Sequence, residues 1–368
     1  MTSINLATEK TQDSILEKVE FASYVVDVDK ETYLPKMQKE LAIGDYYQWD
    51  TSAIISVIND DYIYAFTSSN CIKADRKTMK VVENKYLSTG IMSSYKGRTF
   101  VDDGDYIYGL IRVSPDHRIF KMNKATLAIT TGRWITTNTY GLPSRIITAG
   151  DKLVVGTNTN GAYIIDKTSM DFIGSKNINP SGNPTIDILY GGDKYPLIYM
   201  FSRLSGTSAM YIMTWNLTGS VVGAYQSPSY KANNNNGFLQ YADDDNFLLT
   251  SENQAYALNK QTLEVRILQG ARSTSAIDMY LAYMTDGKVR SFRFNINGRT
   301  TSITDFKTGE ELERYPIRND ISIGDIIAFN DIVYCVCSVT INGTQEVPSI
   351  TELKDVYQIK EYKKVVPK

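Results

Sequence analysis

Short apolar runs along this chain end in polar turns, and the same arrangement recurs many times. The apolar run 162–165 is followed by Asp166-Lys167-Thr168, and the run 255–258 is followed by Asn259-Lys260-Gln261-Thr262. Asp and Asn hydrogen-bond to their own backbone two residues on, so each site predicts a tight turn between two strands. The residues that begin these turns, some in looser copies of the motif, are Asp29, Asp75, Asn123, Asp166, Asn216, Asn259 and Asp305.

A second series of turns follows the same period. Each member lies between two apolar runs, as Asp61 does between 54–58 and 62–66. The members are Asp61, Asp105, Asp151, Asp193, Asp245, Asp286 and Asp331. Two turns per unit define a four-stranded meander with strands a to d, and a period of roughly 40–50 residues is typical of β-propellers. We therefore predict an all-β fold: a seven-bladed β-propeller of four-stranded antiparallel blades.

The last unit is incomplete at the C-terminal end of the chain. Its a–b turn is at Asp331, and no clean Asx-Lys-x-Thr turn follows, whereas the turn at Asp29 has no unit of its own. We therefore expect residues 23–37 to complete the last blade, so that N- and C-terminal strands close the ring and leave few exposed edges. The sequence leaves open whether 355–360 is strand c and the N-terminal segment supplies only strand d.

Loop lengths distinguish the two faces of the predicted ring. The a–b and c–d turns are short and share one face, whereas several b–c and d–a connections on the other face are long. Long loops on a rigid scaffold are common recognition sites. Our candidates for binding a polar or glycan-like partner on this loop face are Tyr140, Tyr230, Asn234 and Asn235. The alternative, that these loops are tolerated insertions, stays open.

Residues 1–20 precede the repeats and have a different pattern. Thr8 to Val19 favours a short helix with Ile15, Leu16 and Val19 on one side, and such a helix is marginal alone in water. We expect two parts, an N-terminal docking extension over 1–20 and the propeller over 21–368. Leu6, Ile15, Leu16 and Val19 are the candidate docking residues. A frayed tail, or a helix lying on the flank of the domain, is the alternative.

Composition and side-chain chemistry favour no catalytic, metal or cofactor site. The formal net charge is −2, which provides no basic field for nucleic acid, and no apolar run is long enough to insert in a membrane. The single histidine, His117, follows Pro115-Asp116 in an expected b–c loop, where neighbouring residues rarely form a triad. The acidic clusters 102–105 and 243–245 fall where the period requires turns, so we expect turns there and not calcium sites.

The three cysteines are Cys71, Cys335 and Cys337, too few and too scattered for a disulfide framework. We expect Cys335 and Cys337, which alternate along one strand, to be small core residues. The N-terminus has no secretory signal pattern. These features favour a protein made in a reducing cytoplasm.

Two resemblances add to this interpretation. The segment Ile4-Asn5-Leu6-Ala7-Thr8-Glu9-Lys10-Thr11-Gln12 resembles the opening of various tailed-bacteriophage structural proteins, which implies a virion component. The repeats resemble quinoprotein-like propellers, in which a strand ends in Asp/Asn-x-x-Thr-Gly. Here Thr-Gly is present only at 218–219 and 308–309, and the three tryptophans are not periodic, so a cofactor is not implied.

We therefore expect a non-enzymatic structural or attachment component of a bacteriophage virion (tail, collar or capsid-associated), assembled in the host cytoplasm. Its expected partners are other virion proteins, in several copies, and a host surface glycan or receptor. The alternative is a propeller that binds a glycan or a protein through its loop face.

Overall fold

The computed structural model describes most of the propeller and part of the chain termini. The described residues are 26–28, 31–48, 54–67, 69–87, 99–113, 116–135, 143–157, 161–177, 185–203, 209–218, 220–231, 238–251, 254–272, 279–295, 298–318, 321–341, 344–345 and 349–365. All regular structure within these ranges is β-strand, and no helix in them is long and apolar enough to cross a membrane. The chain divides into two units, one comprising Leu41–Lys354 and the other Met1–Glu40 with Asp355–Lys368.

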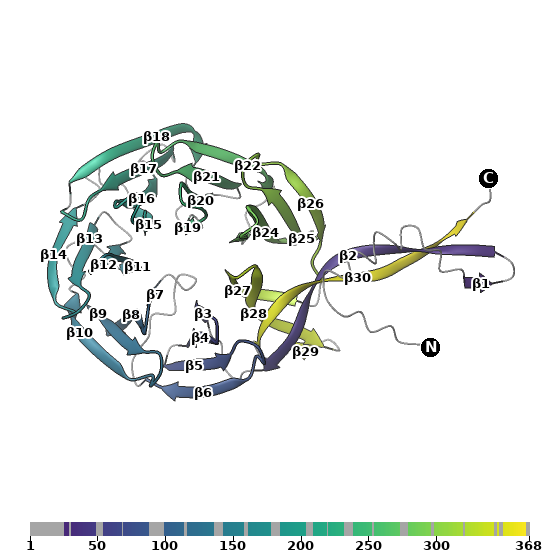
Figure 1. The fold of residues 1–368 in the computed structure, drawn as a ribbon, viewed down its shortest axis with the longest axis horizontal. Coiled ribbons are helices and arrows are strands. Elements are labelled where there is room, and N and C mark those ends of the chain that lie inside the picture. Colours follow the sequence, from purple (N-terminus) through teal and green to yellow (C-terminus); the bar gives the residue numbers. More distant parts are fainter. Residues whose placement is uncertain are drawn as a thin grey trace. The chain divides into compact units, whose positions relative to one another are not determined.

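The larger unit is a seven-bladed β-propeller, as predicted (Figure 1). Six blades are continuous in sequence. Blade 1 contains β3 (Ile54–Ile58), β4 (Tyr62–Phe66), β5 (Asn70–Asp75) and β6 (Val81–Tyr86); blade 2 contains β7 (Phe100–Asp103), β8 (Tyr106–Val113), β9 (Asp116–Asn123) and β10 (Ile129–Ile135); blade 3 contains β11 (Pro143–Ala149), β12 (Lys152–Thr157), β13 (Gly161–Asp166) and β14 (Phe172–Asn177).

Blade 4 contains β15 (Thr185–Tyr190), β16 (Ile198–Arg203), β17 (Ala209–Trp215) and β18 (Val221–Lys231); blade 5 contains β19 (Phe238–Tyr241), β20 (Asn246–Ser251), β21 (Gln254–Asn259) and β22 (Val265–Arg272); blade 6 contains β23 (Met279–Tyr283), β24 (Lys288–Asn295), β25 (Gly298–Asp305) and β26 (Glu311–Pro316). In every blade the first strand is innermost and the fourth is outermost.

Blade 7 is assembled from both ends of the chain, which confirms that the terminal strands close the ring. Its strand order is β27 (Ile321–Phe329), β28 (Ile332–Ile341), β30 (Ser349–Val365) and β2 (Glu31–Gln48). Strand c is therefore C-terminal and the N-terminal segment supplies only strand d. The residues of β30 that pair with β28 are Ser349–Leu353, whereas the candidate strand c at 355–360 lies in the smaller unit, so that placement was wrong. Two short strands extend the same sheet: β29 (Thr344–Gln345) pairs with β28, and β1 (Val26–Val28) pairs with β2.

The expectation that residues 23–37 complete this blade was wrong. The part of β2 that belongs to the propeller begins at Leu41, whereas residues 26–28 pair with 31–33 in the other unit, in the register Val26↔Tyr33. The motif at Asp29 thus joins a local hairpin and not strands c and d of a blade. A turn motif specifies that the two flanking strands pair with each other, and it carries no information about the sheet that they join.

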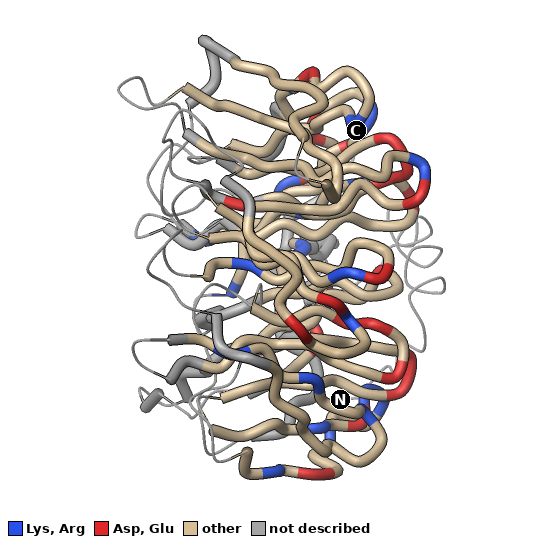
Figure 2. The backbone as a smooth tube through the Cα atoms, turned by 90° about the vertical axis from the view of Figure 1, so that its left-hand side faces the viewer, with Lys and Arg blue, Asp and Glu red and all other residues tan. Residues whose placement is uncertain are grey.

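The two predicted turn series lie on one face of the ring and are hydrogen-bonded to each other. In blade 2 the backbone N–H of Lys124, in the c–d turn, donates to the carbonyl of Asp105 in the a–b turn (2.9 Å), and Lys260 and Asp245 make the same bond in blade 5 (2.8 Å). Figure 2 shows charged residues concentrated along these turns. Within a c–d turn the Asx side chain accepts backbone hydrogen bonds, as Asp75 Oδ1 does from Thr78 N at 2.7 Å.

A bulky apolar residue in the left-handed region follows most c–d turns, always four positions after the Asx residue. Leu127 has φ 50° and Leu263 has φ 62°, and the N–H of each bonds back to the Asx carbonyl, at 2.8 and 3.0 Å. Met79 and Met170 occupy the same position in their blades. These side chains are buried against the preceding blade, as Leu127 is against Tyr64 and Phe66 of blade 1. We call them plug residues.

Blade 6 makes the same inter-blade contact with a different residue. Its left-handed position is Gly309, with φ 80°, where an added Cβ would meet the carbonyl oxygen of Ile267 at 2.9 Å. Phe306, three residues earlier, is buried instead and packs against Leu248 and Leu268 of blade 5. In blade 6 the buried apolar residue is therefore the second residue of the turn and not the last one. The left-handed position, which a bulky apolar residue occupies in blades 1, 2, 3 and 5, is a glycine here.

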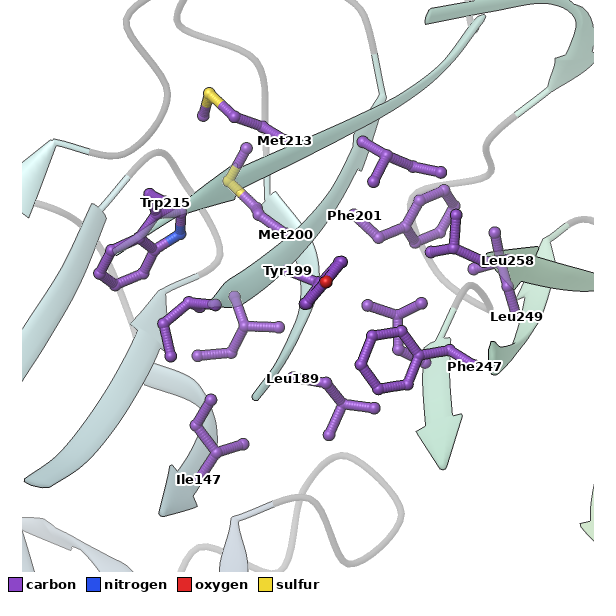
Figure 3. Close-up of a cluster of buried hydrophobic side chains, with 14 of the residues drawn as sticks. Ile147, Leu189, Tyr199, Met200, Phe201, Met213, Trp215, Phe247, Leu249 and Leu258 are labelled. Carbon is purple, nitrogen blue, oxygen red and sulfur yellow. The ribbon is translucent and has the colours of Figure 1, made fainter. Parts of the chain in front are cut away.

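The hydrophobic core lies between neighbouring blades. The largest cluster joins blades 3, 4 and 5 and includes Trp215, Tyr199 and Phe247 (Figure 3). The Tyr199 hydroxyl also donates to the carbonyl of Lys260 in the next blade at 2.7 Å, and Tyr64 and Tyr108 make the equivalent bonds to Lys124 and Lys167, both at 3.2 Å. Burial raises the pKa of each of these tyrosines to about 12, so the hydroxyl remains a donor at physiological pH.

Candidate functional site

Most of the residues that the sequence singled out for docking or binding lie outside the described residues. These are Leu6, Ile15, Leu16 and Val19 of the N-terminal extension and Tyr140, Asn234 and Asn235 of the loop face. The expected boundary between residues 20 and 21 lies outside them too. The roles proposed for these side chains therefore stay predictions.

Tyr230 lies in a strand and not in the expected d–a loop. Strand β18 continues to Lys231, and its register against β17 moves from Met210↔Ser227 to Ala209↔Lys231. The strand includes Pro228, which lacks the backbone N–H that a ladder hydrogen bond needs. In a strand that constraint is met by an irregularity in the pairing, which is what the register change shows.

His117 lies in the interior and not in the expected b–c loop. The register of β8 and β9 continues to Val113↔Asp116, so the connection is shorter than expected and His117 belongs to β9. Its backbone pairs with Arg112 on one side and Ile135 on the other, and the residue is 1% exposed. The sequence did not reveal this because a Pro-Asp-His segment is equally compatible with a loop.

The acidic clusters 102–105 and 243–245 lie at the a–b turns, where their carboxylates make ion pairs and accept hydrogen bonds. Asp102 pairs with Lys124, and Asp103 pairs with Lys167 of the next blade at 3.0 Å. Asp245 accepts from Lys194 (2.7 Å) and from the Tyr195 hydroxyl (2.6 Å), and the Lys194 hydrogen bond lowers the pKa of this carboxyl. Within the described ranges no group of three or more His, Cys, Asp or Glu side chains is placed to hold a metal ion.

A buried ion pair joins the innermost strands of blades 3, 4 and 5. Asp187, on β15, is 1% exposed, and its Oδ2 accepts from Arg145 Nη1 of β11 at 2.6 Å and from the backbone N–H of Leu239 of β19 at 2.7 Å. Arg145 Nη1 also donates to the Leu239 carbonyl at 2.8 Å. This pair was not predicted from the sequence, although a single carboxylate within the apolar run 186–190 was a signal for it.

The ion pair is built as a structural element. A carboxylate this deeply buried requires both a cationic partner and additional hydrogen bonds. Asp187 has these from Arg145 of blade 3, from Leu239 of blade 5 and from the N–H of its own neighbour Ile188, which donates to Oδ1 at 2.9 Å. Both β11 and β15 change register immediately before the charged residue, between Pro143 and Arg145 and between Thr185 and Asp187. Bulges re-aim side chains, and the repeated bulge accounts for the matched positions of the two groups. We infer that the pair fixes the spacing of the inner strands.

The smaller unit contains the N-terminal part of β2, the C-terminal part of β30 and the short strand β1. We call residues 31–40 of β2 and 355–365 of β30 the terminal ribbon. Lys39 Nζ of β2 lies 3.4 Å from Asp355 Oδ2 of β30, so this ion pair crosses between the two strands at one end of the ribbon. Strand β1 pairs with β2 over 31–33. The candidate docking element of the described structure is this ribbon.

Comparison with known proteins supports the fold. No protein-family model matches the chain, and no curated protein matches it. Among solved structures it is similar to BamB from Moraxella catarrhalis, with a TM-score of 0.50 and 12% sequence identity over 84% of this chain and 90% of that chain. The chain thus has the β-propeller fold of that structure, and a likeness at this identity establishes the fold alone.

Proposed function

We propose that this protein is a non-enzymatic protein-interaction propeller that serves as a structural or attachment component of a bacteriophage virion. The observation that carries the proposal is that both strands ending the closing blade, β2 and β30, extend into a second unit. A propeller needs only strands of ordinary blade length, and the other outermost strands in the described blades have 6 to 11 residues, whereas β2 has 18. The additional residues are available for docking.

The virion assignment rests on a separate clue, the resemblance of residues 4–12 to the opening of phage structural proteins. In the proposal, the N-terminal extension with Leu6, Ile15, Leu16 and Val19 attaches the propeller to other virion proteins. The ring provides a rigid body, since its turn face is occupied by hydrogen bonds and ion pairs between neighbouring blades. In the proposal the partners are other virion proteins and a host surface glycan or receptor, with no nucleic acid, no membrane insertion and no cofactor.

Deletion of residues 2–20 tests this function. We expect the shortened protein to unfold at the same urea concentration as the full chain, because the deletion removes no described strand, and to be absent from purified particles. Incorporation is measured by immunoblotting of gradient-purified particles from infected cells that express a tagged copy. The matched control is Leu312→Ala on β26, a half-exposed surface change that should enter particles normally. Normal incorporation of the deletion variant would refute docking through the N-terminus.

A further inference from the structure

Arginines flank the b–c connections of three alternate blades, on the face of the ring opposite the turn face. The relevant positions are the three described residues of each b strand and each c strand that lie nearest to the b–c connection. In blades 2, 4 and 6 these strand ends contain Arg112, Arg118, Arg203, Arg293 and Arg299, which we call the loop-face arginines. Among the described strand ends of all seven blades the only acidic residue is Asp116, and those of blades 1, 3, 5 and 7 are uncharged.

The turn face has the opposite charge pattern. Every a–b turn contains an aspartate, and the turns of blades 2 and 5 contain three each, in the clusters 102–105 and 243–245. Aspartates outnumber basic residues in the described a–b turns. A chain with a formal net charge of only −2 therefore separates its charges between the two faces. Such a distribution steers the cationic side of a molecule towards an anionic partner.

The use of arginine at these strand ends carries information beyond charge. Strands b and c accept lysine near the turn face, as Lys73 of β5, Lys121 of β9 and Lys152 of β12 show, so strand propensity does not explain arginine at their other ends. A guanidinium group binds a carboxylate or a phosphate through two parallel hydrogen bonds, whereas a lysine ammonium acts as a point charge. Arg118 and Arg299 are partly exposed, so a ligand in solution can reach this face.

We propose that the loop-face arginines bind an anionic glycan, a polysaccharide whose sugars carry carboxylate or phosphate groups. This inference rests on the proposed function and deepens it, because it gives the chemistry of the host surface partner. A polymer with repeated anionic groups can contact several blades at once, so that individually weak contacts reinforce one another. Nucleic acid is the other common polyanion, but domains that bind it usually have a pI above about 9, and the sequence pI here is about 5.7.

The test measures binding of the purified full-length protein to immobilised polymers by biolayer interferometry at physiological ionic strength. Polygalacturonate presents carboxylates, phosphomannan presents phosphates, and neutral dextran is the blank. The protein should bind one or both anionic glycans and not dextran. Binding to neither anionic glycan overturns the proposal, and so does tighter binding to single-stranded poly(dT) than to both of them.

Two triple variants with the same change in net charge locate the site. Arg112→Gln/Arg203→Gln/Arg293→Gln should weaken glycan binding by roughly tenfold or more, because it removes charge-assisted hydrogen bonds. The matched control removes three exposed charges of the turn face and should bind within about twofold of the parent, since salt screens distant charges; it is Lys77→Gln/Lys80→Gln/Lys307→Gln. Equal weakening by both variants would mean general charge attraction and would overturn the proposal.

Replacing the same three arginines by lysine separates bidentate recognition from charge. This variant keeps the net charge and should still bind several-fold more weakly than the parent, because an ammonium group lacks the planar fork. Binding equal to that of the parent overturns the proposal. If the glutamine variant unfolds at a lower urea concentration than the parent, the lysine variant decides. All variants keep residues 2–20, so a negative result here leaves the particle-incorporation test of the proposed function unaffected.

Discussion

The plug residues allow one quantitative test of how the blades are joined. Leu127 is fully buried between blades 1 and 2 and has φ 50°, so the structure favours a large apolar side chain in a backbone conformation that favours glycine. Replacing it by alanine or by glycine separates these two requirements. Leu153 of β12 is the matched control, since it is equally buried and has ordinary extended backbone.

The expected magnitudes follow from four contributions. Leu→Ala at a buried site costs about 2.7–5 kcal/mol, and we expect this at both positions. Changing alanine to glycine then removes a buried methyl group, which lowers the free energy of unfolding by about 0.8 kcal/mol. It also raises the conformational entropy of the unfolded chain, which further lowers the free energy of unfolding by about 0.5–1 kcal/mol. At Leu127 glycine also relieves the left-handed penalty, about 1–2 kcal/mol. The difference in stability between the alanine and glycine variants should therefore be about 1–2 kcal/mol smaller at position 127 than at 153.

Urea denaturation of the four variants, followed by tryptophan fluorescence, measures this difference. Trp215 is fully buried in the cluster that joins blades 3, 4 and 5 and should report loss of the ring. We compare the Ala–Gly difference in stability at position 127 with the same difference at position 153, because effects common to all four variants cancel in this comparison. An equal Ala–Gly difference at both positions would mean that the turn does not impose left-handed geometry on Leu127, and would refute the reasoning.

Three further predictions concern closure, the inner ion pair and the turn carboxylates. Leu41→Ala should lower the free energy of unfolding by about 2–5 kcal/mol, since Leu41 is fully buried in the cluster between blades 6 and 7; an effect as small as that of Leu312→Ala would contradict ring closure by β2. Asp187→Asn should cost about 3–5 kcal/mol, since it leaves the Arg145 charge without its carboxylate, and Arg145→Met/Asp187→Leu should recover most of the loss; a single variant as stable as wild type in urea would exclude this role. Backbone N–H groups lower the pKa of three turn carboxyls, so their contribution is present above about pH 4 and is lost as pH falls through the lowered values. The three residues are Asp75, Asp166 and Asp305, and asparagine occupies the same turn position in other blades. Replacing all three by Asn should therefore flatten the acid limb of a stability–pH profile. An unchanged acid limb would argue against the assignment.

The sequence determined the fold of this protein through local rules. A turn depends on a few consecutive residues, so the seven a–b turns and six of the seven c–d turns could be placed from Asp and Asn positions alone. The period then fixed the number of blades. The same local character explains the predictions that were wrong. The motif at Asp29 connects the strands of a hairpin in the smaller unit. The segments around His117 and Tyr230, whose residue types are common in loops, lie in strands.

Features that depend on contacts between distant residues could be decided only by the tertiary structure. Leu41 has no local mark that distinguishes it from other leucines, yet its carbonyl accepts from the N–H of Arg318 at 3.1 Å and it packs against Leu353. Arg145 and Asp187 are 42 residues apart and meet through the inner strands of adjacent blades. Side-chain identity reports what a residue can do, and only the ring brings such residues within reach, because neighbouring blades place equivalent positions of successive units side by side.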